Sequence, residues 1–233
     1  MLRAAFASLL LVVVTPAIAA PPRAARAPQD WTRTVVQTPE GGIRIGNPRA
    51  RSQLVEYGSF TCPHCGAFAR EAFQPIIDRY VRTGRLAFEF RIALRDKADL
   101  VAALTARCAG PGRFFGTAEG LFATQQEWFN RAVAYDQKQP QPPATADLAA
   151  VIGGLADGSG IAAIGIRHGI ARPQLQRCYA DASLRGTLSK AAEDAWNVRQ
   201  IGGTPAFYLN GDKLDGVYGW SALEPQLRAA THG

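Results

Sequence analysis

The chain has 233 residues, which is enough for one large domain or for a smaller domain that carries an insertion. Hydrophobic residues make up 47% and charged residues 19% of the sequence, a balance that favours a packed core and excludes global disorder. The formal net charge is +7, but lysine and arginine are scattered without a basic run, so nucleic acid is not an expected partner.

The first residues have the pattern of a secretory signal peptide. Arg3 supplies the positive end, residues 4–14 are apolar, and Ala17-Ile18-Ala19 is a cleavage site of the small-x-small type. The apolar stretch is short for a membrane span, so an uncleaved anchor is the less favoured alternative. We expect residues 1–19 to be removed, residues 20–40 to form a flexible N-terminal segment, and the protein to be periplasmic.

The following segments predict alternating strands and one helix. Residues 41–47 indicate a short strand, and residues 53–60 form a β-rich run. Apolar residues at helical spacing cover residues 62–81, and Pro75 within them predicts a kink. Residues 86–92 alternate between apolar and polar types as a strand does.

Residues 96–200 carry almost no strand signal and are rich in alanine, leucine and arginine, which predicts an all-helical domain. The proline-rich residues 139–143 indicate a linker, and residues 153–160 indicate a weaker break. The helices expected in this region cover residues 97–108, 113–125, 145–155, 172–179 and 182–200.

The last segment returns to mixed structure. Residues 206–209 and 213–217 predict a hairpin joined by Asn210-Gly211, and residues 220–230 predict a closing helix with Ser221 as its cap.

The full order is β-β-α-β, a helical block, and β-β-α. This order predicts an α/β fold in which a thioredoxin-like core, residues 41–95 and 201–233, is interrupted by an inserted helical domain, residues 96–200.

Two of the four cysteines lie in the sequence Cys62-Pro63-His64-Cys65, where the helix is expected to begin. Unpaired N–H groups and the helix dipole at that position favour a thiolate on Cys62. His64 would lower the pKa of Cys62 further by donating to the sulfur or by its positive charge, and Pro63 stiffens the loop. Cys65, one turn into the helix, would be buried and would act as the resolving thiol.

The alternatives for this pair are half of a zinc site or an inert bridge. Zinc would need two more nearby ligands, but the histidines outside the motif lack partner spacing, and Cys108 and Cys178 lie far away in sequence. We therefore expect Cys62 and Cys65 to form a redox-active disulfide, with no metal and no organic cofactor.

The segment from Glu56 to Cys65, EYGSFTCPHC, resembles the active-site segment of the DsbA family of exported thiol–disulfide oxidoreductases. The helical insertion and Gly203-Thr204-Pro205 resemble that family too, and the likeness extends from about Ile43 to the C-terminus. The resemblance implies that Glu56 is a buried acid that tunes proton transfer at Cys65. The alternative is a residue at the strand end that faces solvent.

The resemblance further implies that the Thr204–Pro205 bond is cis, that Pro205 packs beside the disulfide, and that the Thr204 backbone pairs with an extended substrate segment. An ordinary turn proline is the alternative. Some relatives carry an extra bridge in the inserted domain, so Cys108 and Cys178 are a candidate structural disulfide, with two free thiols as the alternative. Aromatic residues of the insertion would line a substrate groove or belong to the core: Phe114, Phe115, Phe122, Trp128 and Phe129.

These features together predict a monomeric, exported thiol–disulfide oxidoreductase that donates the Cys62–Cys65 disulfide to unfolded or newly exported cysteine-containing proteins. The resemblance implies re-oxidation by a DsbB-like membrane protein linked to quinone. The alternatives are a disulfide isomerase or reductase of the same fold, and a non-catalytic binding or metal-binding module.

Overall fold

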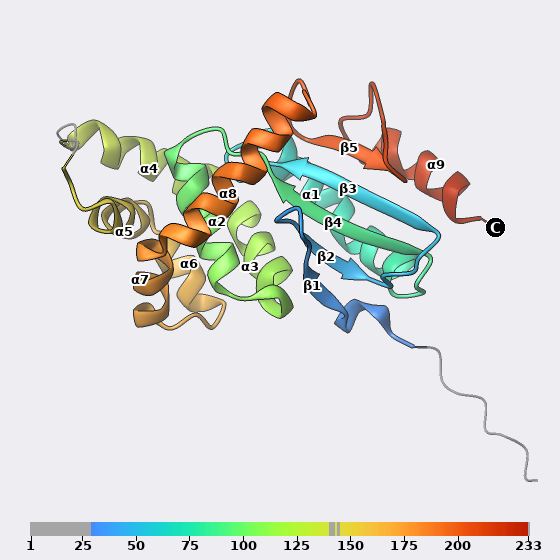
Figure 1. Ribbon diagram of the computed structural model, residues 1–233, viewed down its shortest axis with the longest axis horizontal. Helices are drawn as coiled ribbons and strands as arrows, with labels where there is room; N and C mark the ends of the chain where they lie inside the picture. The colour runs from blue at the N-terminus through green and yellow to red at the C-terminus, as the bar shows by residue number, and fades with distance from the viewer. Residues whose placement is uncertain (1–28, 140–142, 144, 233) are drawn as a thin grey trace, which may run out of the picture.

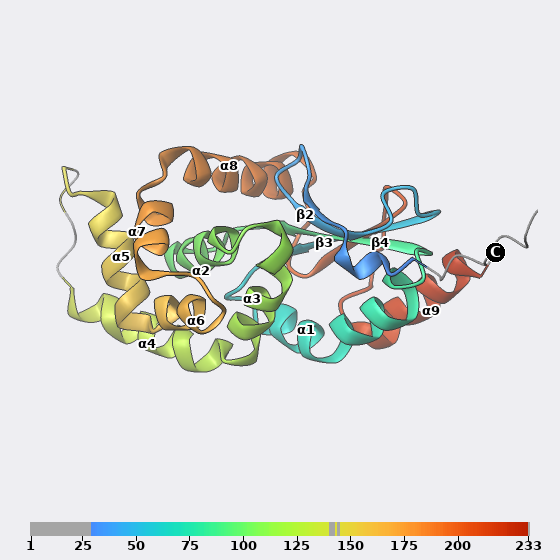
Figure 2. The same cartoon turned by 90° about the horizontal axis from the view of Figure 1, so that it is seen from below.

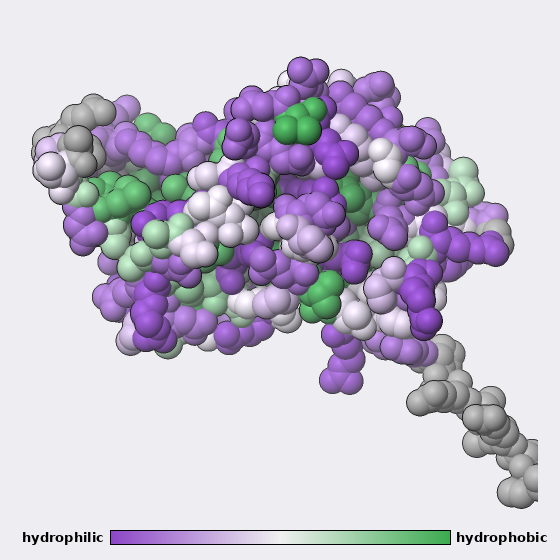
Figure 3. Space-filling model, in the orientation of Figure 1, coloured by the Kyte–Doolittle hydropathy of each residue, from purple (hydrophilic) through white to green (hydrophobic). Residues whose placement is uncertain are grey.

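The computed structural model describes residues 29–139, 143 and 145–232 (Figure 1). The expected signal peptide, residues 1–19, lies outside these residues, as do residues 20–28 of the expected flexible segment and residues 140–142 of the expected linker. Hydrophilic side chains cover most of the face seen in Figure 3, where apolar side chains form small, separate patches.

A six-stranded sheet forms the centre of the described chain, with the strand order β1-β2-β4-β3-β5-β6. Strands β3 and β4 are parallel, because the helix that connects them crosses back over the sheet, and the other neighbours are antiparallel. The strands are β1 (Val35–Gln37), β2 (Ile43–Gly46), β3 (Ser52–Gly58), β4 (Leu86–Ile92), β5 (Ala206–Leu209) and β6 (Asp212–Lys213).

Helices cover the two faces of this sheet differently. Helix α1 (Pro63–Ile76) and helix α9 (Trp220–Thr231) lie on one side, and helix α8 (Ala182–Glu193) lies toward the other (Figure 2). Side chains alternate along β3, so Leu54 enters the main core under α1 whereas Tyr57 joins a smaller cluster on the opposite face.

The helix predicted for residues 62–81 consists of two segments. Helix α1 begins with Pro63 in its first turn, where the missing N–H has no intrahelical partner to lose. After Pro75 the hydrogen-bond pattern changes, and residues Ile77–Val81 form a π-helical segment. Proline removes one backbone donor from the helix interior, which explains why the regular pattern ends here.

The inserted region is all-helical, as predicted, but two of its helices were missed. Helices α4 (Gln125–Lys138) and α6 (Ile161–Arg167) were not expected. The break predicted for residues 153–160 is confined to Gly160, whose φ is 83°, because residues 153–159 continue the preceding helix. The helices are α2 (Lys97–Cys108), α3 (Pro111–Ala123), α4 (Gln125–Lys138), α5 (Leu148–Ser159), α6 (Ile161–Arg167), α7 (Arg172–Ala180) and α8, followed by a π-helical segment (Asp194–Val198).

Three further expectations were wrong in detail. Residues 31–37 are not flexible, because β1 pairs with β2 and extends the sheet by one strand. The returning strand of the last hairpin is only Asp212–Lys213 instead of residues 213–217. Ser221 does not cap α9, which starts after Gly219 without a side-chain cap.

Within the part of the chain that the structure describes, no single helix has the length and apolar character to cross a membrane. Helices α5 and α6 would pass that test only as a pair, and they are bent by 77° relative to each other. Their apolar residues Ile152, Leu155, Ile161 and Ile164 are buried in the core, as expected for packed helices of a folded domain.

Candidate redox site

The two cysteines of the C-x-x-C motif lie where β3 gives way to α1. Cys62 is the N-cap residue of α1, with an extended backbone, and Cys65 is in the first turn. Both are free thiols and both are buried, with exposed fractions of 3% and 0%. Among residues 29–139, 143 and 145–232, no group of three or more His, Cys, Asp and Glu side chains could hold a metal ion.

The surroundings of Cys62 stabilise its anionic form. The Cys65 thiol, the Thr204 side chain and the backbone N–H groups of Cys65 and His64 can donate to Sγ, and together they lower the pKa of Cys62 to about 5 against the opposing effect of burial. In its protonated form, the Cys62 thiol donates to the Thr204 carbonyl oxygen at 3.1 Å. The Cys65 thiol, the Thr204 side chain and the N–H groups at the helix start together favour the thiolate of Cys62 at neutral pH.

Cys65 has the opposite behaviour. Burial raises the pKa of the Cys65 thiol well above its ordinary value, and the hydrogen bond to Cys62 and the charges of Glu56 and Cys62 raise it further. The two sulfurs of one motif are thus separated into an ionised, reactive one and a protonated, protected one.

The two residues between the cysteines are both exposed. Pro63 occupies the first helical turn, as expected. His64 reaches Cys62 through its backbone N–H, which is one of the groups that lower the Cys62 pKa. A contribution of its imidazole charge stays a prediction.

Glu56 lies in β3 beneath this motif, paired with Phe90 of β4 and Phe207 of β5. Its exposed fraction is 4%, so the expectation of a buried acid is confirmed and the solvent-facing alternative is excluded. Its Oε1 atom has no hydrogen-bond partner among the described residues. Burial, and secondly the charge of Cys62, raise the pKa of Glu56 to about 8.

The Glu56 carboxyl lines a small cavity of about 20 Å³ between α1, α3 and β4. Most of the lining is aromatic, including Phe68 and Phe122, but Glu119 of α3 also belongs to it. Glu119 is half-buried, and burial raises its pKa. A cavity of this size has room for about one water molecule.

The loop before β5 completes the site from the far end of the sequence. The Thr204–Pro205 peptide bond is cis, as the resemblance implied. The contact between Cys62 Sγ and the Thr204 carbonyl places this bond directly beside the dithiol.

Two site residues were not identified from the sequence, and both come from the inserted domain. Asp99 of α2 is fully buried and accepts hydrogen bonds from the Ser59 hydroxyl at 2.6 Å and the Phe60 N–H at 2.8 Å. Gln125, the first residue of α4, donates to the carbonyl oxygens of Phe60 and Cys62. The sequence marks Asp99 only as a polar residue in a largely apolar helix, which is too common to be decisive, and Gln125 begins a polar stretch in which nothing distinguishes it.

The other cysteine pair is bridged, so the candidate structural disulfide is confirmed. Cys108 ends α2 and Cys178 lies in α7, and their Cα atoms are 5.9 Å apart. The aromatic residues considered for a groove are mostly core: Phe114, Phe115, Phe122 and Trp128 are buried, and Phe129 packs against them partly exposed.

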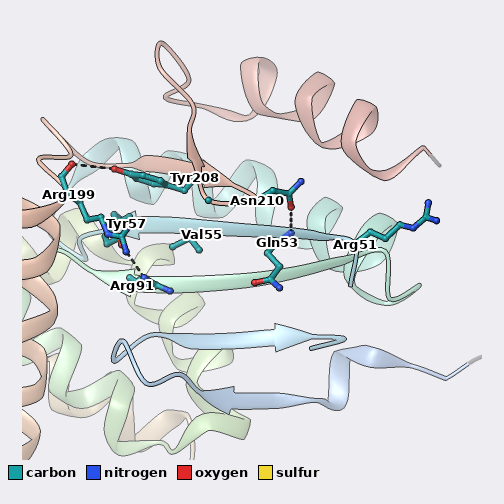
Figure 4. Close-up of a pocket in the computed structure, with 9 residues that line it drawn as sticks. Arg51, Gln53, Val55, Tyr57, Arg91, Arg199, Tyr208 and Asn210 are labelled. Carbon is teal, nitrogen blue, oxygen red and sulfur yellow. Dashed lines mark hydrogen bonds between the residues drawn. The ribbon is translucent and has the colours of Figure 1, made fainter. Parts of the chain in front are cut away.

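A groove of about 440 Å³ lies on the opposite face of the sheet. Figure 4 shows Tyr57, Arg91 and Arg199 at one end of it and Arg51 at the other. Tyr57 and Glu56 are neighbours in β3 and therefore point to opposite faces. The groove and the dithiol are thus on different sides of the sheet.

Comparison with known proteins agrees with this geometry. The sequence model of the thioredoxin family matches residues 38–229. A protein of Rickettsia conorii named "Putative protein-disulfide oxidoreductase" is 28% identical over 167 residues, which cover 72% of this chain and 52% of the relative. A Rickettsia bellii protein of the same name is 26% identical over 172 residues, covering 74% of this chain and 58% of the relative. The chain therefore spans about half the length of these curated relatives.

Solved structures show the same fold. A protein-disulfide isomerase from Novosphingobium aromaticivorans is 29% identical, with a TM-score of 0.75, and the match covers 83% of this chain and 98% of that one. The alpha-DsbA1 protein of Wolbachia pipientis is 20% identical, with a TM-score of 0.64 over 81% of this chain and 89% of that one. The DsbA-like fold predicted from the sequence is confirmed, and because the family match includes both the Cys62–Cys65 pair and Pro205, the chain belongs to the thioredoxin family.

Proposed function

We propose that the protein is a thiol–disulfide oxidoreductase that donates a Cys62–Cys65 disulfide to the thiols of unfolded or newly exported proteins. The observation that carries this proposal is the opposite ionisation of the two sulfurs. A pKa of about 5 at Cys62 stabilises the reduced enzyme, and a stable reduced form makes the corresponding disulfide a strong oxidant.

The proposed reaction proceeds through a mixed disulfide. A substrate thiolate attacks Sγ of Cys62 in the oxidised enzyme, and the S–S bond breaks with its electron pair leaving on Cys65. A second substrate thiolate then attacks the substrate sulfur of the mixed disulfide and releases Cys62 as a thiolate. The substrate loses two electrons and two protons. The enzyme gains the two electrons, one proton ends on Cys65, and the other is released to solvent because Cys62 leaves as a thiolate.

Glu56 has the properties of the proton donor for this step. Its pKa of about 8 keeps it mostly protonated at neutral pH. When Glu56 is ionised, its charge raises the pKa of the Cys65 thiol, so the two groups are electrostatically coupled. We assign to Glu56 the delivery of a proton to Cys65 when that sulfur leaves. We assign to the backbone of Thr204 the pairing with an extended substrate segment beside Pro205.

The proposal includes export, a periplasmic location, a monomeric state and a DsbB-like, quinone-linked membrane protein that re-oxidises the enzyme. The signal-peptide pattern of residues 1–19 supports export. The Cys108–Cys178 disulfide supports an oxidising compartment, since such bridges persist where thiols are not kept reduced.

A disulfide isomerase is the second candidate, favoured by the name of the Novosphingobium aromaticivorans structure. In that role the reduced enzyme would act first, because the Cys62 thiolate would attack a wrongly paired substrate disulfide. Both roles use the same two sulfurs, and they differ in the redox state that starts the cycle.

The equilibrium of the purified protein with glutathione tests the donor role. We expect a potential more oxidising than the roughly −180 mV of protein disulfide isomerase and near the roughly −120 mV of DsbA. A thioredoxin-like potential of about −270 mV would refute the donor role. Rapid oxidation of a dithiol peptide, without reactivation of a scrambled disulfide protein, would separate the oxidase from the isomerase.

A further inference from the structure

The active-site loop, residues 59–62, is held from outside its own domain. Asp99, in the first turn of α2, accepts hydrogen bonds from the Ser59 hydroxyl at 2.6 Å and from the Phe60 N–H at 2.8 Å. The N-cap residue of the same helix, Asp96, accepts a hydrogen bond from the Thr61 hydroxyl at 2.7 Å. The start of α2 therefore binds three successive residues that lead into the redox motif.

A second helix of the insertion holds the carbonyl side of the same loop. The Gln125 amide donates to the Phe60 carbonyl at 2.7 Å and to the Cys62 carbonyl at 2.8 Å. The Cys62 carbonyl also accepts from the Gly66 N–H at 3.1 Å, a backbone hydrogen bond at the start of α1. Phe60 is thus fixed at both its N–H and its C=O by side chains of the inserted domain.

We propose that Asp99 and Gln125 are positioning residues that hold the Cys62 sulfur among its donors, namely the Cys65 thiol, the Thr204 side chain and the N–H groups at the start of α1, so that the inserted helical domain sets how strongly the enzyme oxidises. The inference rests on the proposed function. It adds a role for the insertion, which contributes no sulfur to the reaction.

The position of the Cys62 backbone determines which groups can stabilise the thiolate. The Cys65 thiol, the Thr204 side chain and, to a smaller extent, the N–H groups of Cys65 and His64 act on the Cys62 sulfur only while the backbone of Cys62 keeps its present direction. Gln125 contacts that backbone directly, and its contacts are buried, where hydrogen bonds are strong and where a lost partner is costly.

Gly66 provides an independent indication that the Gln125 position is constrained. A methyl group on Gly66 would overlap Oε1 of Gln125, so the absence of a side chain there leaves room for the amide. The burial of Asp99 indicates that its hydrogen bonds to the loop are needed, because a fully buried carboxyl is unfavourable unless hydrogen bonds offset its desolvation.

The test uses Gln125→Ala in the full-length mature protein, with Gln126→Ala as the matched control. Gln126 is the next residue of α4, is exposed, and bonds to Asn130 of its own helix. Thiolate absorbance against pH gives the ionisation constant of Cys62, and equilibration with glutathione gives the oxidising strength. We expect both to fall about tenfold in Gln125→Ala, which removes the two buried hydrogen bonds to the loop, and to stay unchanged in Gln126→Ala.

Two more variants keep the test decisive if Gln125→Ala does not fold. Gly66→Ala displaces the Gln125 amide from the other side, and Ser59→Ala removes one hydrogen bond to Asp99. Both variants should lower the ionisation constant of Cys62 and the oxidising strength, as Gln125→Ala does. Folded variants with the wild-type ionisation constant and glutathione equilibrium would overturn the inference. The donor role is tested by the redox potential of the wild type, and the positioning role by the difference between the variants and the wild type. Failure of one is therefore distinguishable from failure of the other.

Discussion

Replacing Glu56 by glutamine removes a titrating group whose pKa in the folded protein is about 8 and whose ordinary value is 4.5. At pH 7 the unfolded chain carries an ionised Glu56, whereas the folded chain carries a mostly protonated one. Folding must therefore neutralise this carboxyl, which costs about 1.4 kcal/mol for each pH unit above the ordinary pKa. The total cost at pH 7 is about 3 kcal/mol.

The pH dependence has a defined sign. Below pH 4.5 both states are protonated and Glu56 has no effect on the free energy of unfolding. Between pH 4.5 and about 8 the unfolded state binds fewer protons than the folded state, so the wild type loses stability as pH rises. Above pH 8 the loss becomes constant.

The assay is denaturant unfolding of the wild type and of Glu56→Gln at several pH values. The buried amide has a burial cost of its own, of about 1–3 kcal/mol, but that cost does not vary with pH. The difference between the two proteins should therefore grow in favour of the variant by about 1.4 kcal/mol per unit through this range. Parallel curves would refute the reasoning. Glu71→Gln, which makes the same chemical change at an exposed position of α1, is the matched control.

Further expectations concern the cysteines and the motif histidine. Cys65→Ser should accumulate mixed disulfides between Cys62 and substrate on non-reducing gels, and their absence would contradict the assigned roles. Replacing Cys108 and Cys178 by alanine should lower the free energy of unfolding by up to about 4 kcal/mol, because their bridge spans 70 residues; equal denaturation midpoints would argue against this. His64→Leu keeps the backbone N–H and removes only the exposed imidazole, so thiolate absorbance should show a rise in the Cys62 pKa of less than about one unit.

Much of the fold could be predicted because its signals are local. The helix expected at about residues 97–108 is confirmed as Lys97–Cys108, where Asp96 caps the helix and apolar residues follow at helical spacing. Helix α4 was missed because its many polar residues leave a narrow apolar stripe, carried by Trp128 and Ala132. Strand β1 was missed because three residues show no periodicity, and only pairing with β2 makes them a strand.

The residues of the candidate site also fall into a group that the sequence predicts and a group that it does not. Cys62, Cys65 and Pro205 belong to short motifs whose chemistry is independent of the surrounding fold. Asp99 and Gln125 act through contacts that span 39 to 65 residues of sequence, and no spacing rule connects them to the motif. Long-range hydrogen bonds of this kind become visible only when the helices have been packed.

The disulfide between α2 and α7 has a consequence for how the chain matures. Synthesis delivers Cys62, Cys65 and Cys108 before Cys178, which follows 70 residues after its partner. Until Cys178 is available, the two motif cysteines are the other thiols in the chain with which Cys108 can pair, and a disulfide with either would be incorrect. In the proposed role, closure of the short Cys62–Cys65 ring would remove both from competition, so early oxidation of the motif would protect the correct pairing of the later bridge.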